Sequence, residues 1–443
     1  MQTVITDAGY EKTASLLKTE YASLSGSGSF FALVRTEYDA MGNVVHDFLD
    51  VIAAATAAGY DYVNTIVYPV AEAQCCAFTD NVKYVVWLCK NHAQMSFNKD
   101  AVREKHIWKD VEWGKRAKNY NPRGKDPGNV WIPTEDDGRA HITRHIMLGD
   151  GGVVERLLAM SGCGGDYVLC REERPPAELA LPPAPPRRAA GKPRSRVIFR
   201  SSENMDEIAD GSVQLAVTSP PYWNLKDYFK PGQIGQESYP EYLRRIRAVW
   251  AQCYRKLAAG GSLWININIR VQAGKVITIP HDFVEMCREI GFFYKGIVIW
   301  HKSSGIPTGE KNVVDHHEYV LVFSKSEAFS VDRGVFAQFA DYKNELMNGG
   351  AFWNINRKAG SVGKKYIHPA IYPTELVSRI IRATTAPGGL VLDPFLGSGT
   401  TLIAAEQCGR ACAGYEYNEG FEELMRSRFA AEIPGVEVDL LAP

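Results

Sequence analysis

The chain has 443 residues, of which 45% are hydrophobic, and a formal net charge of −1 at pH 7. This length and apolar content allow two buried cores, and therefore two domains. A nearly neutral chain is not a generally basic nucleic-acid coat, so any nucleic-acid contact must come from local patches. The 9 cysteines include no CxxC pair, which indicates thiols of a reducing compartment. The amino terminus lacks a signal pattern and no apolar run is long enough to cross a bilayer, so we expect a cytoplasmic protein associated with nucleic acid.

Residues 1–172 contain short runs that recur later in the chain. His46-Asp47-Phe48-Leu49 matches His281-Asp282-Phe283-Val284 at an offset of 235 (281 − 46). Val168-Leu169-Cys170 falls on Val391-Leu392-Asp393 at an offset of 223 (391 − 168). Matches at nearly constant offset predict a second copy of one fold, which would let a single chain reproduce a dimer.

A basic and aromatic stretch lies in the second half of this copy. Such a composition suits phosphate contacts and base stacking, so we expect it to grip DNA. The alternative is a solvated surface, because acidic residues are interspersed. The residues selected as candidate DNA contacts are Lys115, Arg116, Lys118 and Arg123.

Residues 173–196 are rich in Pro, Ala and Arg, as in Pro182-Pro183-Ala184-Pro185-Pro186. Prolines hold a chain in a semi-rigid extended form without packing it into a core. This segment is therefore predicted to be a linker between residues 1–172 and a second domain at 197–443.

The tetrad Ser219-Pro220-Pro221-Tyr222 directly follows the apolar run from Val213 to Val217. Such a run predicts a buried strand, and ligands bind at the carboxyl edge of an open α/β sheet. The exocyclic amine of a nucleobase is a poor nucleophile, because its lone pair is delocalised into the ring. The Ser219 hydroxyl and the Pro220 carbonyl can accept its hydrogens, and Tyr222 offers a flat face on which an extruded base can stack.

The segments after the tetrad alternate between helical and extended patterns. Two histidines and an acid, His316-His317-Glu318, precede one strand, but no further ligands stand at metal spacing, so we expect no metal. The expected helices are 239–257 and 282–290, and the expected strands are 262–269, 296–300 and 319–324.

A glycine-rich loop, Asp393 to Thr401, follows the apolar residues Leu390 to Leu392. Gly397 and Gly399 allow the backbone to approach a bound molecule, and a helix then opens with unpaired amides that attract a carboxylate. A strand over 411–415 follows and ends in Glu416, an acid placed to accept hydrogen bonds from a ribose. No lysine follows the glycines, which argues against a phosphate-binding P-loop.

At these two motifs the chain resembles a DNA amino-methyltransferase of the permuted, or beta, group, in which the tetrad precedes the cofactor loop. The resemblance covers 197 to about 431. It implies an α/β, Rossmann-like seven-stranded methyltransferase sheet, preceded here by a degenerate methyltransferase-like copy. It also implies S-adenosylmethionine as cofactor and direct methyl transfer to an amine. The cofactor contacts that it implies are Asp393, Phe395, Gly397, Ser398, Gly399, Thr400, Thr401 and Glu416, with His368 and Pro373 in a further motif.

The resemblance also suggests where DNA is contacted. Lys302 stands in the segment that resembles the family's loop beside the target base, although a solvated lysine is equally compatible with the sequence. Residues 327–366 occupy the place of the target-recognition segment. The basic residues that would approach DNA there are Arg357, Lys358, Lys364 and Lys365.

The first residue of the tetrad bears on the base that is modified. Family members that modify N4 of cytosine usually carry Ser there, and those that modify N6 of adenine carry Asp or Asn, so Ser219 favours cytosine. Adenine N6 is the alternative, and an inert DNA-binding regulator or an RNA methyltransferase are further alternatives. A partner restriction endonuclease is compatible with this function, and either a monomer acting as a pseudo-dimer or a homodimer fits the sequence.

Overall fold

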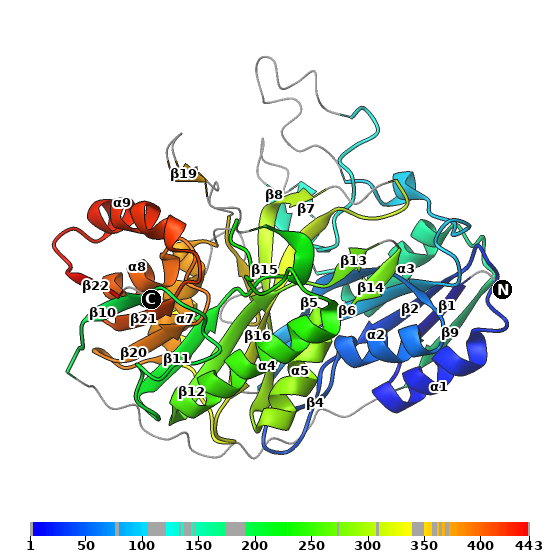
Figure 1. Cartoon of the computed structure of the whole chain (residues 1–443). Helices are drawn as coiled ribbons and strands as arrows, with labels where there is room; N and C mark the ends of the chain where they lie inside the picture. Colours follow the sequence, from blue (N-terminus) through cyan, green and yellow to red (C-terminus); the bar gives the residue numbers. More distant parts are fainter. Residues whose placement is uncertain are drawn as a thin grey trace.

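The computed structural model describes residues 3–75, 79–104, 121–132, 134–136, 143–145, 147–172, 191–227, 229–272, 274–306, 310–338, 350–356, 361–362, 366–367 and 372–441. The chain forms two α/β halves side by side, each built on its own main sheet (Figure 1). The expected α/β class is confirmed. Among the described helices, none is both long and apolar enough to span a membrane.

The second half is built on a nine-stranded sheet with the order β17-β15-β16-β12-β11-β20-β21-β10-β22. Every pairing is parallel except those that β16 makes with β12 and β15. Its strands are β10 (Ser195–Ile198), β11 (Val213–Thr218), β12 (Leu257–Ile267), β15 (Phe293–Ile306), β16 (Asp315–Ser324), β17 (Phe352–Asn354), β20 (Leu390–Asp393), β21 (Ala411–Tyr415) and β22 (Val438–Leu441).

Two expectations about this half need correction. The sheet has nine strands and not seven, because β22 pairs outside β10 and β17 pairs outside β15. The linker was expected to reach residue 196, but Ser195 and Arg196 already pair with β21 and β22. Alternation of polar and apolar residues is too short in these strands to separate them from a loop by sequence alone.

Helices pack against this sheet, and their ends follow local capping chemistry. α4 begins after Ser238 with a proline in its first turn, and α5 ends at Gly291, whose φ of 113° suits glycine. α4 and α5 pack against β12, β15 and β16, whereas α7 and α8 pack against β11, β20 and β21 (Figure 1). The helices are α4 (Tyr239–Lys256), α5 (Ile279–Ile290), α6 (Arg333–Gln338), α7 (Thr374–Thr384), α8 (Thr400–Gln407) and α9 (Glu422–Glu432).

The first half is built on a five-stranded sheet with the order β5-β6-β2-β1-β9. Its strands are β1 (Thr3–Asp7), β2 (Ser29–Val34), β5 (Asp61–Cys75), β6 (Thr79–Cys89) and β9 (Tyr167–Arg171). Its helices are α1 (Tyr10–Glu20), α2 (Phe48–Ala57) and α3 (Gly149–Ser161). Shorter paired strands are β3 (Glu37–Tyr38), β4 (Val44–His46), β7 (Thr134–Asp136) and β8 (Thr143–His145) in this half, and β13 (Arg270–Gln272), β14 (Lys275–Ile277), β18 (Ser361–Val362) and β19 (Tyr366–Ile367) in the second.

The five strands of the first sheet have the same order and directions as β15-β16-β12-β11-β20 of the second sheet. β1 is parallel to β2 and β9, as β11 is to β12 and β20. β6 is antiparallel to β2 and β5, as β16 is to β12 and β15. Within the described residues the first sheet stops at β9, whereas the second continues through β21, β10 and β22.

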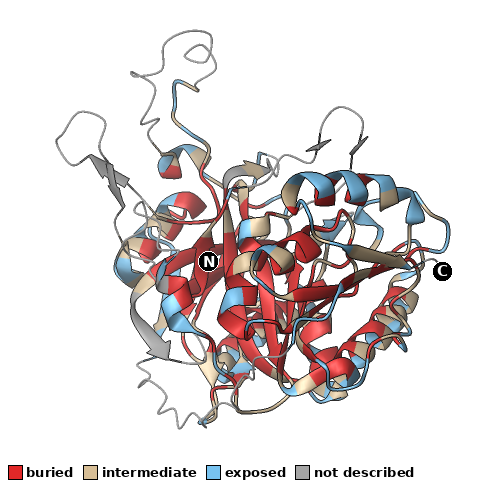
Figure 2. Ribbon diagram, turned by 90° about the vertical axis from the view of Figure 1, so that its left-hand side faces the viewer, coloured by how far each residue is buried: buried red, intermediate tan, exposed pale blue. Residues whose placement is uncertain are grey.

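The two halves share buried structure. One hydrophobic cluster includes Phe48 and Tyr84 of the first half together with Tyr319 of the second, and Phe48 contacts both tyrosine rings. Figure 2 shows that buried residues fill the interior of the molecule and that exposed residues lie on its outer surface. Burial of apolar side chains between two sheets holds them in a fixed relation.

Residues 127–131 form a strap that hydrogen-bonds to both halves. Asn129 N donates to Val314 O at 2.9 Å, and Trp131 N donates to Val67 O at 2.8 Å. At Gly128 an added Cβ would lie 2.7 Å from the His316 ring. The second half makes the equivalent close contact with the first, because a Cβ added at Gly350 would lie 2.1 Å from Asn81 Oδ1. Positions 81 and 316 are 235 residues apart (316 − 81), the offset seen in the sequence.

Candidate active site

The tetrad lies directly after β11, at the carboxyl edge of the second sheet. A hydrogen bond from α4 fixes the tetrad loop, because Tyr242 Oη donates to Pro221 O at 2.7 Å. Trp223 has a φ of 50°, and its Nε1 donates to Glu237 O at 2.8 Å, so the chain turns back sharply after Tyr222. A fixed loop holds the Ser219 hydroxyl and the backbone beside it in one position, as stabilisation of a reacting group requires.

A hydrogen-bond network of side chains from three neighbouring strands surrounds the tetrad. Tyr222 Oη donates to Glu318 Oε2 at 2.8 Å, and Lys302 Nζ donates to Glu318 Oε1 at 2.8 Å. Asn266 Nδ2 lies 2.8 Å from Glu318 Oε2 and 3.4 Å from Ser219 Oγ. These groups meet because β16 runs antiparallel to β12 and β15, so its first residues lie at the edge where the other two strands end.

The charges in this network are balanced inside the protein. Burial opposes ionisation of Glu318, but the Lys302 ammonium and the hydrogen bonds from Asn266 and Tyr222 together more than offset it, so the pKa of Glu318 lies below its ordinary value. Burial lowers the pKa of His301 and His317 to about 3, which leaves both rings neutral at pH 7. Ionised Glu318 therefore accepts a hydrogen bond from the Tyr222 hydroxyl, and this bond holds the Tyr222 ring in place.

The expected role of Lys302 as a direct DNA contact needs correction. Its side chain is 1% exposed, and its ammonium is paired with Glu318. Burying a lysine is costly, and an unpaired buried ammonium costs still more than one that is paired in this way. The sequence placed Lys302 beside the target site, but gave no sign that the strand end on which it lies is covered.

The glycine-rich loop follows β20, which lies next to the tetrad strand β11 in the sheet. Gly397 and Gly399 have φ values of 57° and 84°, a region that suits glycine. Gly397 N donates to Glu416 Oε2 at 2.9 Å, and Asn418 N donates to Glu416 Oε1 at 2.7 Å. Burial raises the pKa of the Glu416 carboxyl to about 7, although both backbone donors oppose this shift.

Asp393 connects the glycine loop to the tetrad strand. Its Oδ1 accepts from Thr218 Oγ1 at 2.6 Å and from Phe395 N at 3.0 Å. Its Oδ2 accepts from Tyr372 Oη at 3.1 Å and from Thr401 Oγ1. The carboxyl is fully buried, and burial raises its pKa. Asp393 thus holds β11, the loop and the start of α8 together, in addition to any contact with a ligand.

Arg428 of α9 supports the loop from the other side. Its Nη1 donates to Ser398 O at 2.9 Å, to Ser398 Oγ at 2.8 Å and to Thr400 Oγ1 at 2.8 Å. The residue is completely buried and its Nε donates to Glu432 Oε1. A buried guanidinium with several fixed acceptors holds its partners rigidly, because leaving any of them unpaired is costly.

The remaining predicted residues divide into described and undescribed positions. Pro373 lies directly before α7, beside Tyr372 of the Asp393 group. Arg123 is described, but its Nη1 donates to Asp100 Oδ2 at 2.9 Å. The residues that lie outside the described part of the chain are His368, Lys115, Arg116, Lys118, Arg357, Lys358, Lys364 and Lys365.

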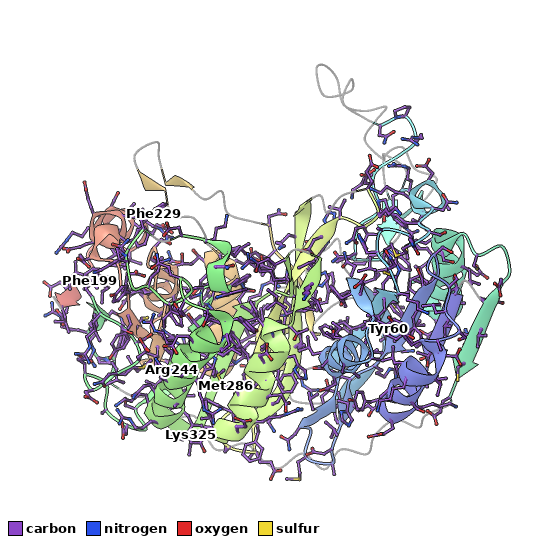
Figure 3. The ribbon with its side chains drawn as sticks, turned by 45° about the vertical axis from the view of Figure 1, so that its right-hand side comes forward. Tyr60, Phe199, Phe229, Arg244, Met286 and Lys325 are labelled. Atoms are coloured by element: carbon purple, nitrogen blue, oxygen red, sulfur yellow. The ribbon has the colours of Figure 1, made fainter. Side chains whose placement is uncertain are left out.

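Sequence reasoning missed several residues of this edge. Asn266 and Glu318 lie 44 and 96 positions from Tyr222 in sequence and meet it only through the sheet. Arg428 lies in α9, whose sequence has no feature that marks it as part of a site. Phe229, with a φ of 65° and 70% of its surface exposed, lies at the top of this half (Figure 3). The one local signal was Glu318, an acid at the start of an apolar strand.

Comparison with known proteins identifies the family. A family model described as DNA methylase, N6_N4_Mtase, matches residues 213–427. Type II methyltransferase M.XycI of Xanthomonas campestris pv. cyanopsidis is 30% identical over 258 residues, which are 51% of this chain and 84% of that protein. The chain belongs to this DNA methylase family. The match to the family model begins at β11, so it covers only the second half of the chain, which is called the methylase half below.

Two further similarities each cover more than half of this chain. Type II methyltransferase M.Cfr9I of Citrobacter freundii is 30% identical over 258 residues, covering 51% of this methylase and 84% of that protein. The solved structure of PvuII DNA methyltransferase (cytosine-N4-specific) is 22% identical, with a TM-score of 0.45, and covers 57% of this chain and 99% of that one.

The glycine loop provides a matched pair of substitutions. In Gly399→Ala the new Cβ would lie 2.6 Å from Phe429 Cε1, in addition to the strain of a left-handed φ. We expect this variant to lose about 2–4 kcal/mol of unfolding free energy and its loop geometry. Gly409→Ala has a similar φ of 73° but open space around the Cβ, so it should lose about 1 kcal/mol. Urea unfolding of both variants measures the difference, and equal losses would contradict the crowded packing.

Proposed function

We propose that this methylase is an S-adenosylmethionine-dependent DNA methyltransferase that transfers a methyl group to N4 of a cytosine turned out of the duplex. The observation that carries the proposal is the Asp393 group, which fixes the tetrad and the glycine loop at one edge of the same sheet. Family membership supports methyl transfer to DNA. The tetrad and its surroundings support an amine as the acceptor.

The residues of the loop fit the proposed cofactor. The left-handed glycines keep side chains away from the loop surface, and the first amides of α8 follow directly. Those amides suit the carboxylate of an amino-acid moiety. Glu416 directly follows β21 and would accept hydrogen bonds from a ribose. When bound, S-adenosylmethionine supplies an electrophilic methyl group.

The tetrad residues would prepare the target amine. The Ser219 hydroxyl and the Pro220 carbonyl would accept its two hydrogens and direct the nitrogen lone pair toward the methyl donor. The Tyr222 ring would stack on the extruded base, and its hydroxyl is fixed by Glu318. A base held between a fixed ring and fixed acceptors is positioned for direct transfer, with no covalent bond to the protein.

Cytosine is favoured over adenine by Ser219, the first residue of the tetrad. Both bases carry an exocyclic amine, and the shape of the pocket contributes to the choice between them. N6 of adenine is therefore the alternative target. The fold and the roles of the tetrad are the same in either case.

We further propose that residues 1–172 are a methyltransferase-like copy that serves as a built-in partner. Its sheet has the order of five strands of the methylase half and, within the described residues, ends at β9. In β9, Cys170 stands at the position of Asp393, and Arg171 and Glu172 follow in place of the glycine loop. Without the Asp393 group and the glycines, this copy has no counterpart of the cofactor loop.

Substitutions in the tetrad should separate binding from chemistry. Ser219→Ala removes one acceptor for the amine, and Tyr222→Ala removes the stacking ring, so each should lose about 10²-fold or more in turnover. Cofactor affinity, measured by calorimetry, should stay unchanged because the glycine loop is intact. Ser212→Ala, at an exposed serine before the same strand, is the matched control and should keep full activity. Wild-type turnover in Ser219→Ala would contradict the assigned role.

The labelled product decides the reaction. The purified chain is incubated with S-adenosylmethionine labelled in the methyl group and with duplex DNA of mixed sequence, and the digested nucleosides are analysed by mass spectrometry. We expect labelled N4-methylcytosine. Labelled N6-methyladenine would overturn the choice of base but keep the mechanism. Bound cofactor without labelled DNA would contradict the proposed function, and structured RNA offered in parallel tests the related substrate.

The built-in partner makes a prediction about assembly. If the first half occupies the face that a second subunit would use, the chain should be a monomer across the concentrations used for assay. Sedimentation velocity measures this directly. A concentration-dependent dimer would show that the contact between the two halves does not replace contact with a second chain.

A further inference from the structure

Two facing helices carry the same short pattern of polar residues. The sequence from His46 to Asp50 reads His-Asp-Phe-Leu-Asp, and the sequence from His281 to Glu285 reads His-Asp-Phe-Val-Glu, 235 residues later (281 − 46). The first lies at the start of α2 and the second within α5, and these helices pack against each other across the two halves (Figure 1). The repeat therefore brings two His-x3-carboxylate pairs to one place.

The central residues of each pattern have structural partners. Asp47 Oδ2 accepts from Tyr294 Oη at 2.7 Å, and Asp282 Oδ2 accepts from Tyr239 Oη. The next residues in the two patterns, Phe48 and Phe283, are buried in the hydrophobic cluster that the two halves share. The outer histidine and carboxylate of each pattern are not needed for these contacts, and three of these four residues, Asp50, His281 and Glu285, form a separate cluster.

The atoms of this cluster have the spacing of metal ligands. One ligand atom each from Asp50, His281 and Glu285 lies within 4.8 Å of the other two. His281 Nε2 is 3.6 Å from Asp50 Oδ1. In a tetrahedral zinc site with bonds of about 2.1 Å, ligand atoms are about 3.4 Å apart. His46 Nδ1 lies 3.7 Å from Asp50 Oδ2 and is buried without a hydrogen-bond partner among the described residues.

Neighbouring groups orient the carboxylates without using all of their oxygens. Asp50 Oδ2 accepts from Asp47 N at 2.9 Å, which directs Oδ1 toward His281. Glu285 Oε1 accepts from Arg288 Nη1 at 2.7 Å, which leaves Oε2 for another partner. Such outer contacts hold metal ligands in place. Arg288 offsets one of the two carboxylate charges, so the pair still carries a net negative charge toward a cation.

We propose that Asp50, His281 and Glu285 bind a zinc ion that fastens α2 to α5, with His46 or water in the fourth position. Imidazole and carboxylate ligands in a four-coordinate arrangement suit Zn²⁺ better than Mg²⁺ or Ca²⁺, which prefer six or more oxygens. One ligand comes from the first half and two come from the second. An ion bound by both halves stabilises their packed arrangement, because the separated halves cannot form the site.

Zinc titration of the tag-free full-length chain, stripped of metal by a chelator, tests the site. Calorimetry should show one equivalent of Zn²⁺ bound by the wild type, and zinc should raise its melting temperature. Glu285→Gln keeps the size of an exposed side chain but removes a ligand charge, so it should weaken binding at least about tenfold. His281→Ala should do the same. The matched control is Glu289→Gln, one helical turn further along α5, which pairs with Arg247 and should bind as the wild type does.

Cobalt distinguishes this cluster from other zinc ligands such as cysteine. Co²⁺ in the wild type should give the visible absorption of a tetrahedral site with nitrogen and oxygen ligands, and Glu285→Gln should lose it. Zinc affinity in Glu285→Gln equal to that of the wild type would overturn the proposal, as would the absence of saturable binding. The Asp50 and His281 side chains would then form an ion pair between the halves and nothing more. Because Glu285 is exposed, this variant tests the proposal even if His281→Ala does not fold.

Discussion

The buried Asp393 carboxyl is the interaction on which the active edge of this protein depends. It accepts hydrogen bonds from the tetrad strand, from the glycine loop, from the first turn of α8 and from Tyr372 before α7. Thr218, 175 residues away in the sequence, is therefore held at the same point as the glycine loop, the start of α8 and Tyr372. Burying a carboxyl costs free energy unless its oxygens are satisfied, so the surrounding donors and the carboxyl require one another.

The sequence predicted those parts of the site that lie at the ends of single strands. The tetrad and the glycine loop each follow a short apolar run, so their place at a sheet edge could be read locally. Asn266 and Arg428 could not be found in this way, because they reach the site only through the pairing of strands and the packing of α9. Glu318 gave only the signal of an acid at the start of an apolar strand. Lys302 was placed near the site, but its burial depends on Glu318 of the neighbouring strand, which no local pattern reveals.

The sequence likewise predicted those strands of the fold that have a clear local pattern and missed those that have none. The strands with strong apolar runs, such as β11 and β16, were expected where they occur. The edge strands β17, β22 and the start of β10 were not, because short and partly exposed strands have no clear alternation. The repeat was visible in the sequence as a constant offset. Its strand order and the exchanged contacts of Gly128 and Gly350 required the structure.

The first sheet shares the order of five strands with the second, but Cys170 stands where the second half has Asp393. Under the proposed function, this asymmetry has a consequence for the product. A symmetric pair of identical subunits offers two equivalent catalytic edges, and so matches a palindromic site in which both strands are equivalent. Under the proposed function, a chain with Asp393 in one half and Cys170 at the same position in the other would present a single competent edge to the duplex. If it works as a monomer, each encounter modifies one strand only, and the recognised sequence has no need to be its own complement.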